Sequence, residues 1–326
     1  MRVAVLGGGA WGTALAAQAV RAGLETRLWV RAAELASALN ERRENTAYLP
    51  GIELPAGLRA TASLAEAVLD AEAVLVAVPS EFCRAIFGQI ATLAPAAALV
   101  VSATKGLETE TLLRMSEVAA AEAPGHALAV ISGPSFAVEV ARQLPTAVVV
   151  ASADHGVAER VQRALATRSF RVYSSEDVPG VELAGAVKNV IAIAAGIIDG
   201  LGYGANTVAA LITRGLAEIS RLAVAQGGRP DTLAGLAGLG DLVLTCTGAL
   251  SRNRTVGQRL GRGQDLAVAS AGLHPEGVRT TLATAALAER HGIDMPIVRQ
   301  MRAVLYQGKP PREALEELML RSLKRE

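Results

Sequence analysis

Short apolar runs alternate with segments of helical apolar spacing along the first half of the chain. Several runs are nearly continuous valine, alanine, leucine and isoleucine, which is typical of strands covered on both faces. Strands are expected at 2–6, 26–30, 73–78, 98–102, 127–131, 147–151 and 170–173, and helices at 12–22, 31–43, 81–93, 108–121 and 155–166. This alternation predicts a doubly wound parallel sheet.

The pattern changes near Glu176. Beyond this residue no run has a convincing strand pattern, and helical segments separated by glycines continue to the C-terminus. Helices are expected at 181–198, 205–226, 251–260, 276–290, 297–306 and 312–323, with a glycine-rich break at 235–240. The sequence therefore predicts an α/β chain, with a sheet domain at 1–178 and an all-α C-terminal substrate and catalytic domain at 179–326.

Composition narrows the classes of function. The 326 residues suit two domains, and 32 basic against 31 acidic residues argue against a nucleic-acid partner. Cys83 and Cys246 lie far apart without zinc or disulfide spacing, which favours a reducing cytoplasm and predicts no metal site. The most apolar stretch, 181–201, contains charged residues, and its longest uncharged piece, 190–198, is far shorter than the ~20 residues of a membrane span.

A glycine-rich loop directly follows the first expected strand. Residues 7–12 read Gly-Gly-Gly-Ala-Trp-Gly, a G-x-G-x-x-G pattern, and a helix is expected immediately after it. In such a loop Gly7 permits the tight turn, Gly9 lets the backbone approach a pyrophosphate, and Gly12 lets the helix pack closely on the strand. Because unpaired N–H groups at a helix start attract phosphates, this context predicts a Rossmann dinucleotide site rather than an ordinary glycine-rich turn.

The end of the second expected strand bears on the choice of cofactor. An NAD site usually has an acidic residue there for the ribose hydroxyls, but the nearest acid is Glu34, inside the next helix. Arg31 stands where the 2′-phosphate of NADP would lie, which favours NADP(H) and leaves NAD(H) as an alternative. A cap or solvated residue at a helix start explains Arg31 about equally well.

Lys188 stands out because only four of the basic residues are lysines and this one lies in an apolar stretch. Burying a lone ammonium is costly unless the lysine is paired or its pKa falls. A lysine of lowered pKa exchanges a proton near neutral pH, as reduction of a ketone requires. A lysine that extends from a helix edge to water is the competing interpretation. The scarcity of lysine and the adjacent Asn189 favour proton transfer.

Two loops after expected strands carry polar residues at the carboxyl edge of the sheet, where doubly wound folds bind ligands. Lys105 follows the strand at 98–102 and can meet an anion, or is a solvated loop residue. Residues 132–137, Ser-Gly-Pro-Ser-Phe-Ala, offer backbone N–H donors, or form a strand-to-helix turn capped by Ser135.

Three segments of the second half also bear on a ligand site. Asp241 lies in an apolar, glycine-rich stretch and is either the partner of the buried lysine or a helix N-cap. Residues 251–254, Ser-Arg-Asn-Arg, join a cap to a fork-shaped cation that suits a phosphate, with a surface basic cluster as the alternative. Residues 274–277, His-Pro-Glu-Gly, are ordinary for a helix start.

These motifs closely resemble the bacterial NAD(P)-dependent glycerol-3-phosphate dehydrogenase family. The resemblance runs from Gly7 to about Tyr306 and is most specific at 132–137 and 235–241. It implies an oxidoreductase that reversibly reduces dihydroxyacetone phosphate to sn-glycerol 3-phosphate with NAD(P)H. It also implies a supply of product to glycerophospholipid synthesis, a cytoplasmic location and a homodimer.

The resemblance implies roles for individual residues as well. Lys188 matches the catalytic proton donor and acceptor, and Asn189 beside it is assigned to the same substrate site. The other implied substrate contacts are Lys105, Gly133, Ser135, Asp241, Ser251, Arg252 and Asn253. The cofactor contacts are the loop glycines Gly7, Gly9 and Gly12, together with Ala10, Trp11, Arg31, Lys105, Ala137, Arg252, His274 and Glu276. The chain departs from the family pattern at Ala10, where serine is frequent, and at His274, where an aliphatic residue is usual.

Two other functions remain open at this stage. One is a reductase of the same architecture that acts on a different phosphorylated or acidic ketone, which turnover of dihydroxyacetone phosphate would distinguish. The other is a binding module that senses NADP. A sensor has no use for a buried proton donor, so Lys188 argues against it.

Overall fold

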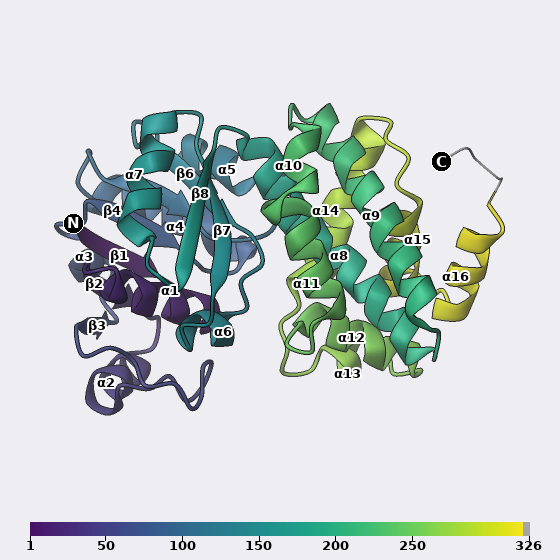
Figure 1. Cartoon of the computed structure of the whole chain (residues 1–326), viewed down its shortest axis with the longest axis horizontal. Helices are drawn as coiled ribbons and strands as arrows, with labels where there is room; N and C mark the ends of the chain where they lie inside the picture. The colour runs from purple at the N-terminus through teal and green to yellow at the C-terminus, as the bar shows by residue number, and fades with distance from the viewer. Residues whose placement is uncertain (322–326) are drawn as a thin grey trace. The chain divides into compact units, whose positions relative to one another are not determined.

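A computed structural model of the chain describes residues 1–321 (Figure 1). They form two compact units, of which the first consists of Met1–Lys105 and Leu113–Glu182. The second consists of Gly106–Leu112 and the chain from Leu183 onward. Helix α8 (Val178–Gly200) continues without a break through this division. The domain boundary between 178 and 179 stays a prediction.

The first unit is built on an eight-stranded sheet in the order β3-β2-β1-β4-β5-β6-β7-β8. Its strands are β1 (Arg2–Leu6), β2 (Glu25–Trp29), β3 (Leu58–Thr61), β4 (Ala73–Val76), β5 (Leu99–Ser102), β6 (Leu128–Ser132), β7 (Thr146–Ala151) and β8 (Phe170–Ser175). Its helices are α1 (Ala10–Arg21), α2 (Ala33–Arg42), α3 (Leu64–Val68), α4 (Ser80–Leu93), α5 (Met115–Glu122), α6 (Ala137–Ala141) and α7 (His155–Leu165). The predicted doubly wound α/β fold, with a helical unit after it, is confirmed.

Successive side chains of a strand point to opposite faces of the sheet, and each face has its own hydrophobic core. On β1, Val3 and Val5 join the core beneath α1, α6 and α7, whereas Ala4 and Leu6 join the core beneath α3, α4 and α5. Both faces are therefore covered, which explains why the strands read as continuous apolar runs.

The expectation of a wholly parallel sheet is wrong at β7, which pairs antiparallel with β6 through Ile131↔Val150. A parallel return requires a helix that carries the chain back along the whole strand. Helix α6 has five residues and rises ~7.5 Å, about half the ~16 Å length of the five-residue β6. The chain therefore turns back beside β6, and the longer α7 then allows β8 to run parallel to β7.

From α8 onward, the described part of the second unit consists of helices and the loops that join them. It contains most of α8, then α9 (Ala205–Ala225), α10 (Pro230–Ala234), the π-helical turn η1 (Leu236–Gly240), α11 (Asp241–Thr247), α12 (Arg252–Gly261), α13 (Leu266–Ser270), α14 (Glu276–Arg290), α15 (Pro296–Tyr306) and α16 (Pro311–Met319). Helix α8 is long and apolar enough to cross a bilayer, but its most apolar window is entirely buried inside protein. That test alone is weak evidence for a membrane span, because core helices also pass it.

Helices α8 and α12 touch through their backbones. A Cβ on Gly196 would lie 2.0 Å from the Arg254 carbonyl oxygen, and one on Gly257 would lie 2.0 Å from that of Ile193. Such a close approach is available only to glycine. It brings the start of α12 next to the middle of α8, where Lys188 and Asn189 lie.

Three further sequence-based expectations differ from the structure. The helix expected at 108–121 begins at Met115, because Leu107 and Leu112 are buried in the core of the second unit and the chain returns with Leu112 at φ 65°. The expected glycine-rich break at 235–240 is a π-helical turn that continues into α11. The helix expected at 312–323 spans Pro311–Met319, and its expected end lies outside the described residues.

Candidate functional site

The loop between β1 and α1 places each glycine in a constrained position. Gly7 has φ 122°, donates its N–H to the Trp29 carbonyl at 3.0 Å, and has no room for a Cβ, which would lie 2.6 Å from the Ala77 oxygen. A Cβ on Gly12 would lie 1.9 Å from the Gly7 oxygen. Gly9 instead faces open space at the N-cap of α1, without a side-chain cap. The loop therefore holds its shape tightly and leaves one face clear.

This loop fits a dinucleotide phosphate. The first N–H groups of α1 have no acceptor within the helix, and no acidic side chain lies in its first turn. Nearby, Trp11 has an indole N–H that is buried and has no partner among the described residues. Backbone donors, the positive end of the helix dipole and an open Gly9 are what a pyrophosphate requires. Ala10 contributes only its backbone there.

Arg31 lies at the position expected from the sequence, two residues beyond the end of β2. Its side chain is exposed and has no ion pair in the described structure, while the N-cap of α2 is Ala32. The acidic residue closest in sequence, Glu34, is exposed in the first turn of α2. The loop after β2 therefore presents a cation, and a capping role for Arg31 has no support.

The carboxyl ends of β5 and β6 bring three of the predicted residues together. Lys105 Nζ donates to the Gly133 carbonyl at 3.0 Å, and the Ser135 hydroxyl donates to the same oxygen at 2.9 Å. Gly133 has φ 133°, and a Cβ there would lie 3.0 Å from the Cα of Val148. One carbonyl thus anchors an ammonium and a hydroxyl at the edge of the sheet where doubly wound folds bind ligands.

Lys188 lies inside the second unit, with 5% of its surface exposed. Its ammonium forms an ion pair with the Asp241 carboxylate and donates to the Thr245 hydroxyl at 2.8 Å. Thr245 in turn donates to the Asp241 carbonyl at 2.6 Å. Asp241 is therefore a partner of the lysine rather than a side-chain cap, since the N-cap of α11 is Gly240. Thr245 was missed in the sequence, although its spacing of four from Asp241 puts both on one face of α11.

A second group of predicted residues meets where α8, α12 and α14 converge. Asn253 donates from Nδ2 to Asn189 Oδ1 at 2.9 Å and accepts the Gly277 N–H at 3.0 Å. Ser251 caps α12 by accepting the Arg254 N–H at 3.2 Å. The start of α12 is therefore tied to the helix of Lys188 by side-chain amides.

The remaining predicted cofactor residues lie at or just before the starts of helices. Arg252 is exposed, and its Nη1 donates to the Leu273 carbonyl at 3.4 Å, beside His274 and Glu276 at the start of α14. His274 has φ 46°, a left-handed conformation that is uncommon for a residue other than glycine. Ala137 begins α6. The structure thus groups Arg252 with His274 and Glu276 in the second unit, and Ala137 with the β6 loop in the first.

A reactive thiol and a metal cluster are not found among the residues that the structure describes. Cys246 is buried near Lys188, and burial raises the pKa of its thiol to about 12, so it is inert at neutral pH. Within residues 1–321 no three histidine, cysteine, aspartate or glutamate side chains gather in a way that could hold a metal.

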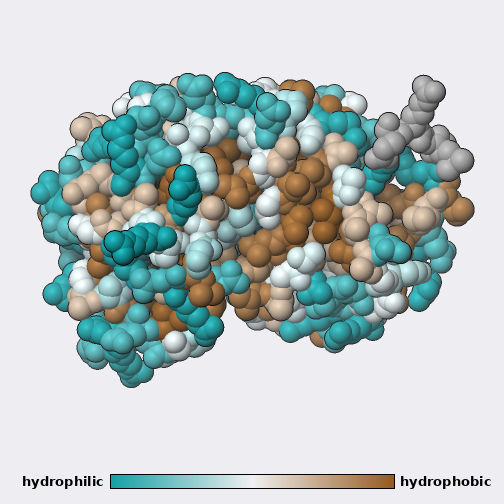
Figure 2. Space-filling model, in the orientation of Figure 1, coloured by the Kyte–Doolittle hydropathy of each residue, from teal (hydrophilic) through white to brown (hydrophobic). Residues whose placement is uncertain are grey.

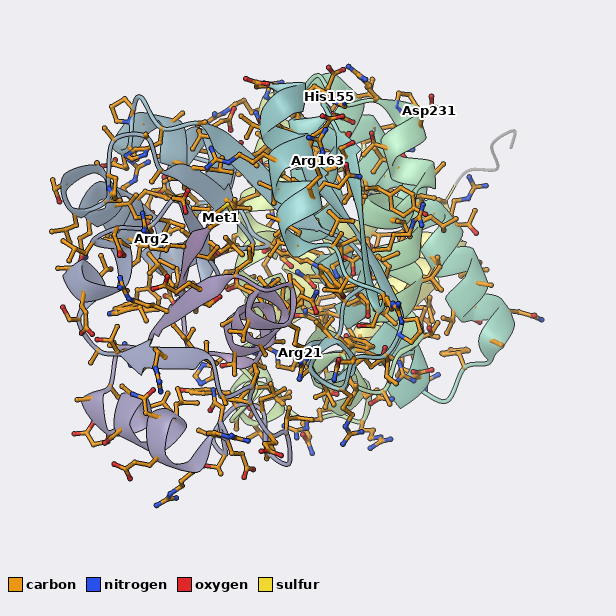
Figure 3. All side chains as sticks on the ribbon, turned by 60° about the vertical axis from the view of Figure 1, so that its left-hand side comes forward. Met1, Arg2, Arg21, His155, Arg163 and Asp231 are labelled. Atoms are coloured by element: carbon orange, nitrogen blue, oxygen red, sulfur yellow. The ribbon has the colours of Figure 1, made fainter. Side chains whose placement is uncertain are left out.

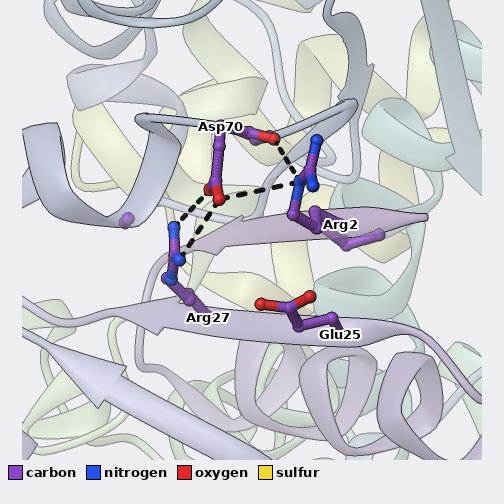
Figure 4. A pocket seen from close by; sticks show the side chains of 7 residues that line it. Arg2, Glu25, Arg27 and Asp70 are labelled. Carbon is purple, nitrogen blue, oxygen red and sulfur yellow. Dashed lines mark hydrogen bonds and ion pairs between the residues drawn. The ribbon is translucent and has the colours of Figure 1, made fainter.

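Two other charged clusters lie away from these residues. At the opposite, amino ends of β1 and β2, Arg2 and Arg27 bind Asp70 in a small hollow (Figure 4), and the Arg27 guanidinium lowers the pKa of that carboxyl. On α7, exposed His155 and Arg163 pair with Glu159, and both labelled side chains lie along that helix in Figure 3. Each cluster already has its opposite charges, so neither offers a ligand site.

Comparison with known proteins decides the family. The model of the NAD-dependent glycerol-3-phosphate dehydrogenase N-terminus matches residues 2–158, and that of the C-terminus matches residues 177–316. The chain belongs to the NAD-dependent glycerol-3-phosphate dehydrogenase family. Both family models match within this one chain, the first over most of the sheet unit and the second over most of the helical unit.

Two relatives and one solved structure illustrate the likeness to other glycerol-3-phosphate dehydrogenases. Proteins named glycerol-3-phosphate dehydrogenase (NAD(P)+) are 51% identical in Geobacter sp. (strain M21), over 100% of this chain and 98% of the relative, and 52% identical in Koribacter versatilis, over 98% and 97%. The crystal structure of glycerol-3-phosphate dehydrogenase from Coxiella burnetii has a TM-score of 0.95 at 42% identity, and the match covers 98% of this chain and 99% of that one.

Proposed function

We propose that this protein catalyses the reversible NAD(P)H-dependent reduction of dihydroxyacetone phosphate to sn-glycerol 3-phosphate. The observation that carries the proposal is the buried Lys188, held by Asp241 and Thr245 in a chain of the glycerol-3-phosphate dehydrogenase family. A buried ammonium with two fixed partners is oriented for proton transfer, and a mere binding module would gain nothing from its cost.

The first unit carries most of the cofactor contacts in this proposal. Gly7, Gly9 and Gly12 shape the loop, the N–H groups of the first turn of α1 hold the pyrophosphate, and Trp11 lies beside them. When bound, the nicotinamide cofactor supplies the hydride. The exposed, unpaired Arg31 supports a preference for NADP(H), with NAD(H) as a second cofactor. Ala10, Lys105, Ala137, Arg252, His274 and Glu276 are the further cofactor contacts proposed from the family pattern.

The substrate roles follow the charges and donors of the described residues. Ser251, Arg252 and Asn253 offer a cap, a guanidinium and an amide at the start of α12, which suits a phosphate. Lys105, Gly133 and Ser135 are proposed as further contacts with the substrate. Lys188 protonates the carbonyl oxygen as it becomes an alkoxide, and Asp241 with Thr245 keeps the ammonium aligned. In the reverse direction the same amine accepts the proton.

Further features of the proposal concern its cellular setting. The product would supply glycerophospholipid synthesis in the cytoplasm, and residues 1–178 and 179–326 would act as the cofactor and substrate domains. A homodimer is proposed as well. Leu239, Val243 and Leu250 are exposed, and apolar surface is visible over the helical unit in Figure 2. Measuring the mass of the purified protein in solution by light scattering tests the dimer.

An oxidation assay tests the proposed reaction. Purified protein with NADPH or NADH should oxidise the nicotinamide only when dihydroxyacetone phosphate is added, and sn-glycerol 3-phosphate with NADP+ should run the reaction backwards. An enzyme that ignores dihydroxyacetone phosphate but reduces another acidic ketone would overturn the substrate and keep the reaction class.

A further inference from the structure

Two buried amides form a short hydrogen-bonded chain in the helical unit. The Gly277 N–H donates to Asn253 Oδ1 at 3.0 Å, and Asn253 Nδ2 donates to Asn189 Oδ1 at 2.9 Å. Asn253 is 8% exposed and Asn189 is 6% exposed, so water does not compete freely for these groups. A Cβ on Gly277 would lie 2.6 Å from the Asn189 carbonyl oxygen, which shows how closely α14 approaches α8 at this point.

The direction of this hydrogen-bonded chain is fixed by the Gly277 N–H, where it begins. An amide side chain can present either its oxygen or its nitrogen, and the choice is set by its hydrogen-bond partners. A backbone N–H can only donate, so Asn253 must turn its oxygen toward Gly277 and its nitrogen toward Asn189. Asn189 must then accept with its oxygen. The Nδ2 of Asn189 therefore faces away from Asn253. On that side Asn189 can only donate hydrogen bonds, through the N–H groups of Nδ2.

Those N–H groups are poorly used inside the protein. Asn189 Nδ2 makes one long hydrogen bond, 3.4 Å, to the Gly185 carbonyl of its own helix. Its second N–H has no acceptor among the described residues. Because a buried donor without an acceptor is costly, this amide is prepared for an acceptor oxygen that arrives with a ligand. Asn189 follows Lys188 directly on α8, in the substrate site of the proposed function.

We propose that Asn253 is a positioning residue, which holds the amide of Asn189 turned so that its N–H groups meet an acceptor oxygen of the bound phosphorylated substrate. This inference rests on the proposed function. Two groups of the substrate, its phosphate and its ketone carbonyl, carry an oxygen that accepts a hydrogen bond and does not donate one. Asn253 therefore contributes to substrate selection through Asn189, in addition to any contact of its own.

Two variants of Asn253 separate positioning from packing. Asn253→Asp keeps the size and the acceptor for Gly277 but cannot donate when ionised, so Asn189 turns over and presents its oxygen to the substrate. Asn253→Leu removes both hydrogen bonds without fixing the reversed direction. Positioning predicts that kcat/KM for dihydroxyacetone phosphate falls about 30-fold or more in Asn253→Asp and about 3- to 10-fold in Asn253→Leu, since each good hydrogen bond is worth roughly tenfold. A merely structural role predicts the opposite order, because the leucine variant loses more of the native bonds.

Two controls accompany the kinetics. Thr255→Asp adds a carboxylate two residues along α12, outside the amide chain, and should lower kcat/KM less than threefold if charge alone is harmless. The Kd for NADPH should stay within about twofold of wild type in all variants, and the melting temperature should fall further in Asn253→Leu than in Asn253→Asp. A loss in Thr255→Asp equal to that in Asn253→Asp would overturn the inference, as would a leucine variant with the lower kcat/KM.

Inhibition by inorganic phosphate, a competitive inhibitor, shows whether Asn189 meets the phosphate or the carbonyl oxygen of the substrate. If Asn189 meets the phosphate, the Ki of inorganic phosphate should rise about tenfold in Asn253→Asp; if it meets the carbonyl, the Ki should not change. Failure of the proposed function looks different, because the wild-type protein itself would then not turn over dihydroxyacetone phosphate. Wild-type turnover with unaltered Asn253 variants would remove this inference alone.

Discussion

Replacement of Lys188 should change both the stability of the protein and its kcat, and the burial of Lys188 explains why. Lys188 and Asp241 are 5% and 1% exposed, so removing the lysine takes the ammonium away from a buried carboxylate. Breaking one side of such a pair costs about 3–5 kcal/mol, a large part of the ~5–15 kcal/mol that stabilises a typical protein. Lys188→Ala is therefore expected to lower both stability and kcat, and low activity alone would not establish a catalytic role.

The double variant Lys188→Met/Asp241→Asn isolates the chemical effect. It removes both charges and keeps the side chains of similar size, so much of the lost stability should return. Its kcat should remain about 10²- to 10⁴-fold below wild type, since that is the usual contribution of a general acid. Lys188→Arg should be nearly as impaired, because guanidinium holds its proton too tightly near pH 7.

Steady-state kinetics, thermal unfolding and NADPH binding should be measured on the same preparations. NADPH should still bind to each Lys188 variant, because the first unit carries the glycine-rich loop. Lys309→Met is the matched control, since Lys309 forms an ion pair with half-exposed Glu317, and its kcat should stay within about twofold of wild type. A double variant or a Lys188→Arg enzyme with near-normal kcat would refute the reasoning and move the proton donor to water or to Lys105.

Three further outcomes are expected. Arg31→Ala should weaken use of NADPH by about 10- to 100-fold and leave NADH little changed, because a charge-assisted hydrogen bond is worth ~1.5–3 kcal/mol; equal losses with both cofactors would make Arg31 structural. Unphosphorylated dihydroxyacetone should be a very poor substrate, and a kcat/KM comparable to that of dihydroxyacetone phosphate would contradict the phosphate contacts at the start of α12. Burial raises the pKa of Glu218 from 4.5 to about 7, so the folded protein holds this proton more tightly than the unfolded chain. Stability should therefore fall by up to about 3 kcal/mol between pH 4.5 and 7 through this group, and urea unfolding at pH 5 and pH 8 should show that fall in wild type but not in Glu218→Gln.

The sequence predicts the Rossmann half well because its strands are buried on both faces. Continuous apolar runs and a glycine loop directly after β1 carry their own physical signature. Strand β3 lacks that signature, since only Leu58 and Ala60 of its four residues are buried. The antiparallel β7 depends on the length of α6, which the residues of the strand do not encode.

Some residues of the candidate site can be predicted from the sequence, whereas the contacts between them cannot. Lys188 and Asp241 are visible in the sequence because charged residues are rare in such apolar surroundings. Their pairing with Thr245 depends on how α8 and α11 pack in the second unit. The chain from Gly277 through Asn253 to Asn189 joins three helices separated by up to 88 residues in sequence, so only the fold reveals it. Helix crossings set by glycines such as Gly196 and Gly257 decide these encounters.

Hydride transfer to a defined carbon is the most direct test of the proposed reaction. The purified protein should be incubated with dihydroxyacetone phosphate and NADPH that carries deuterium at the transferable position of the nicotinamide, and the product should be identified by mass spectrometry and NMR. The proposed reaction predicts sn-glycerol 3-phosphate with one deuterium at C2. Unchanged dihydroxyacetone phosphate, or a product without deuterium at that carbon, would contradict it.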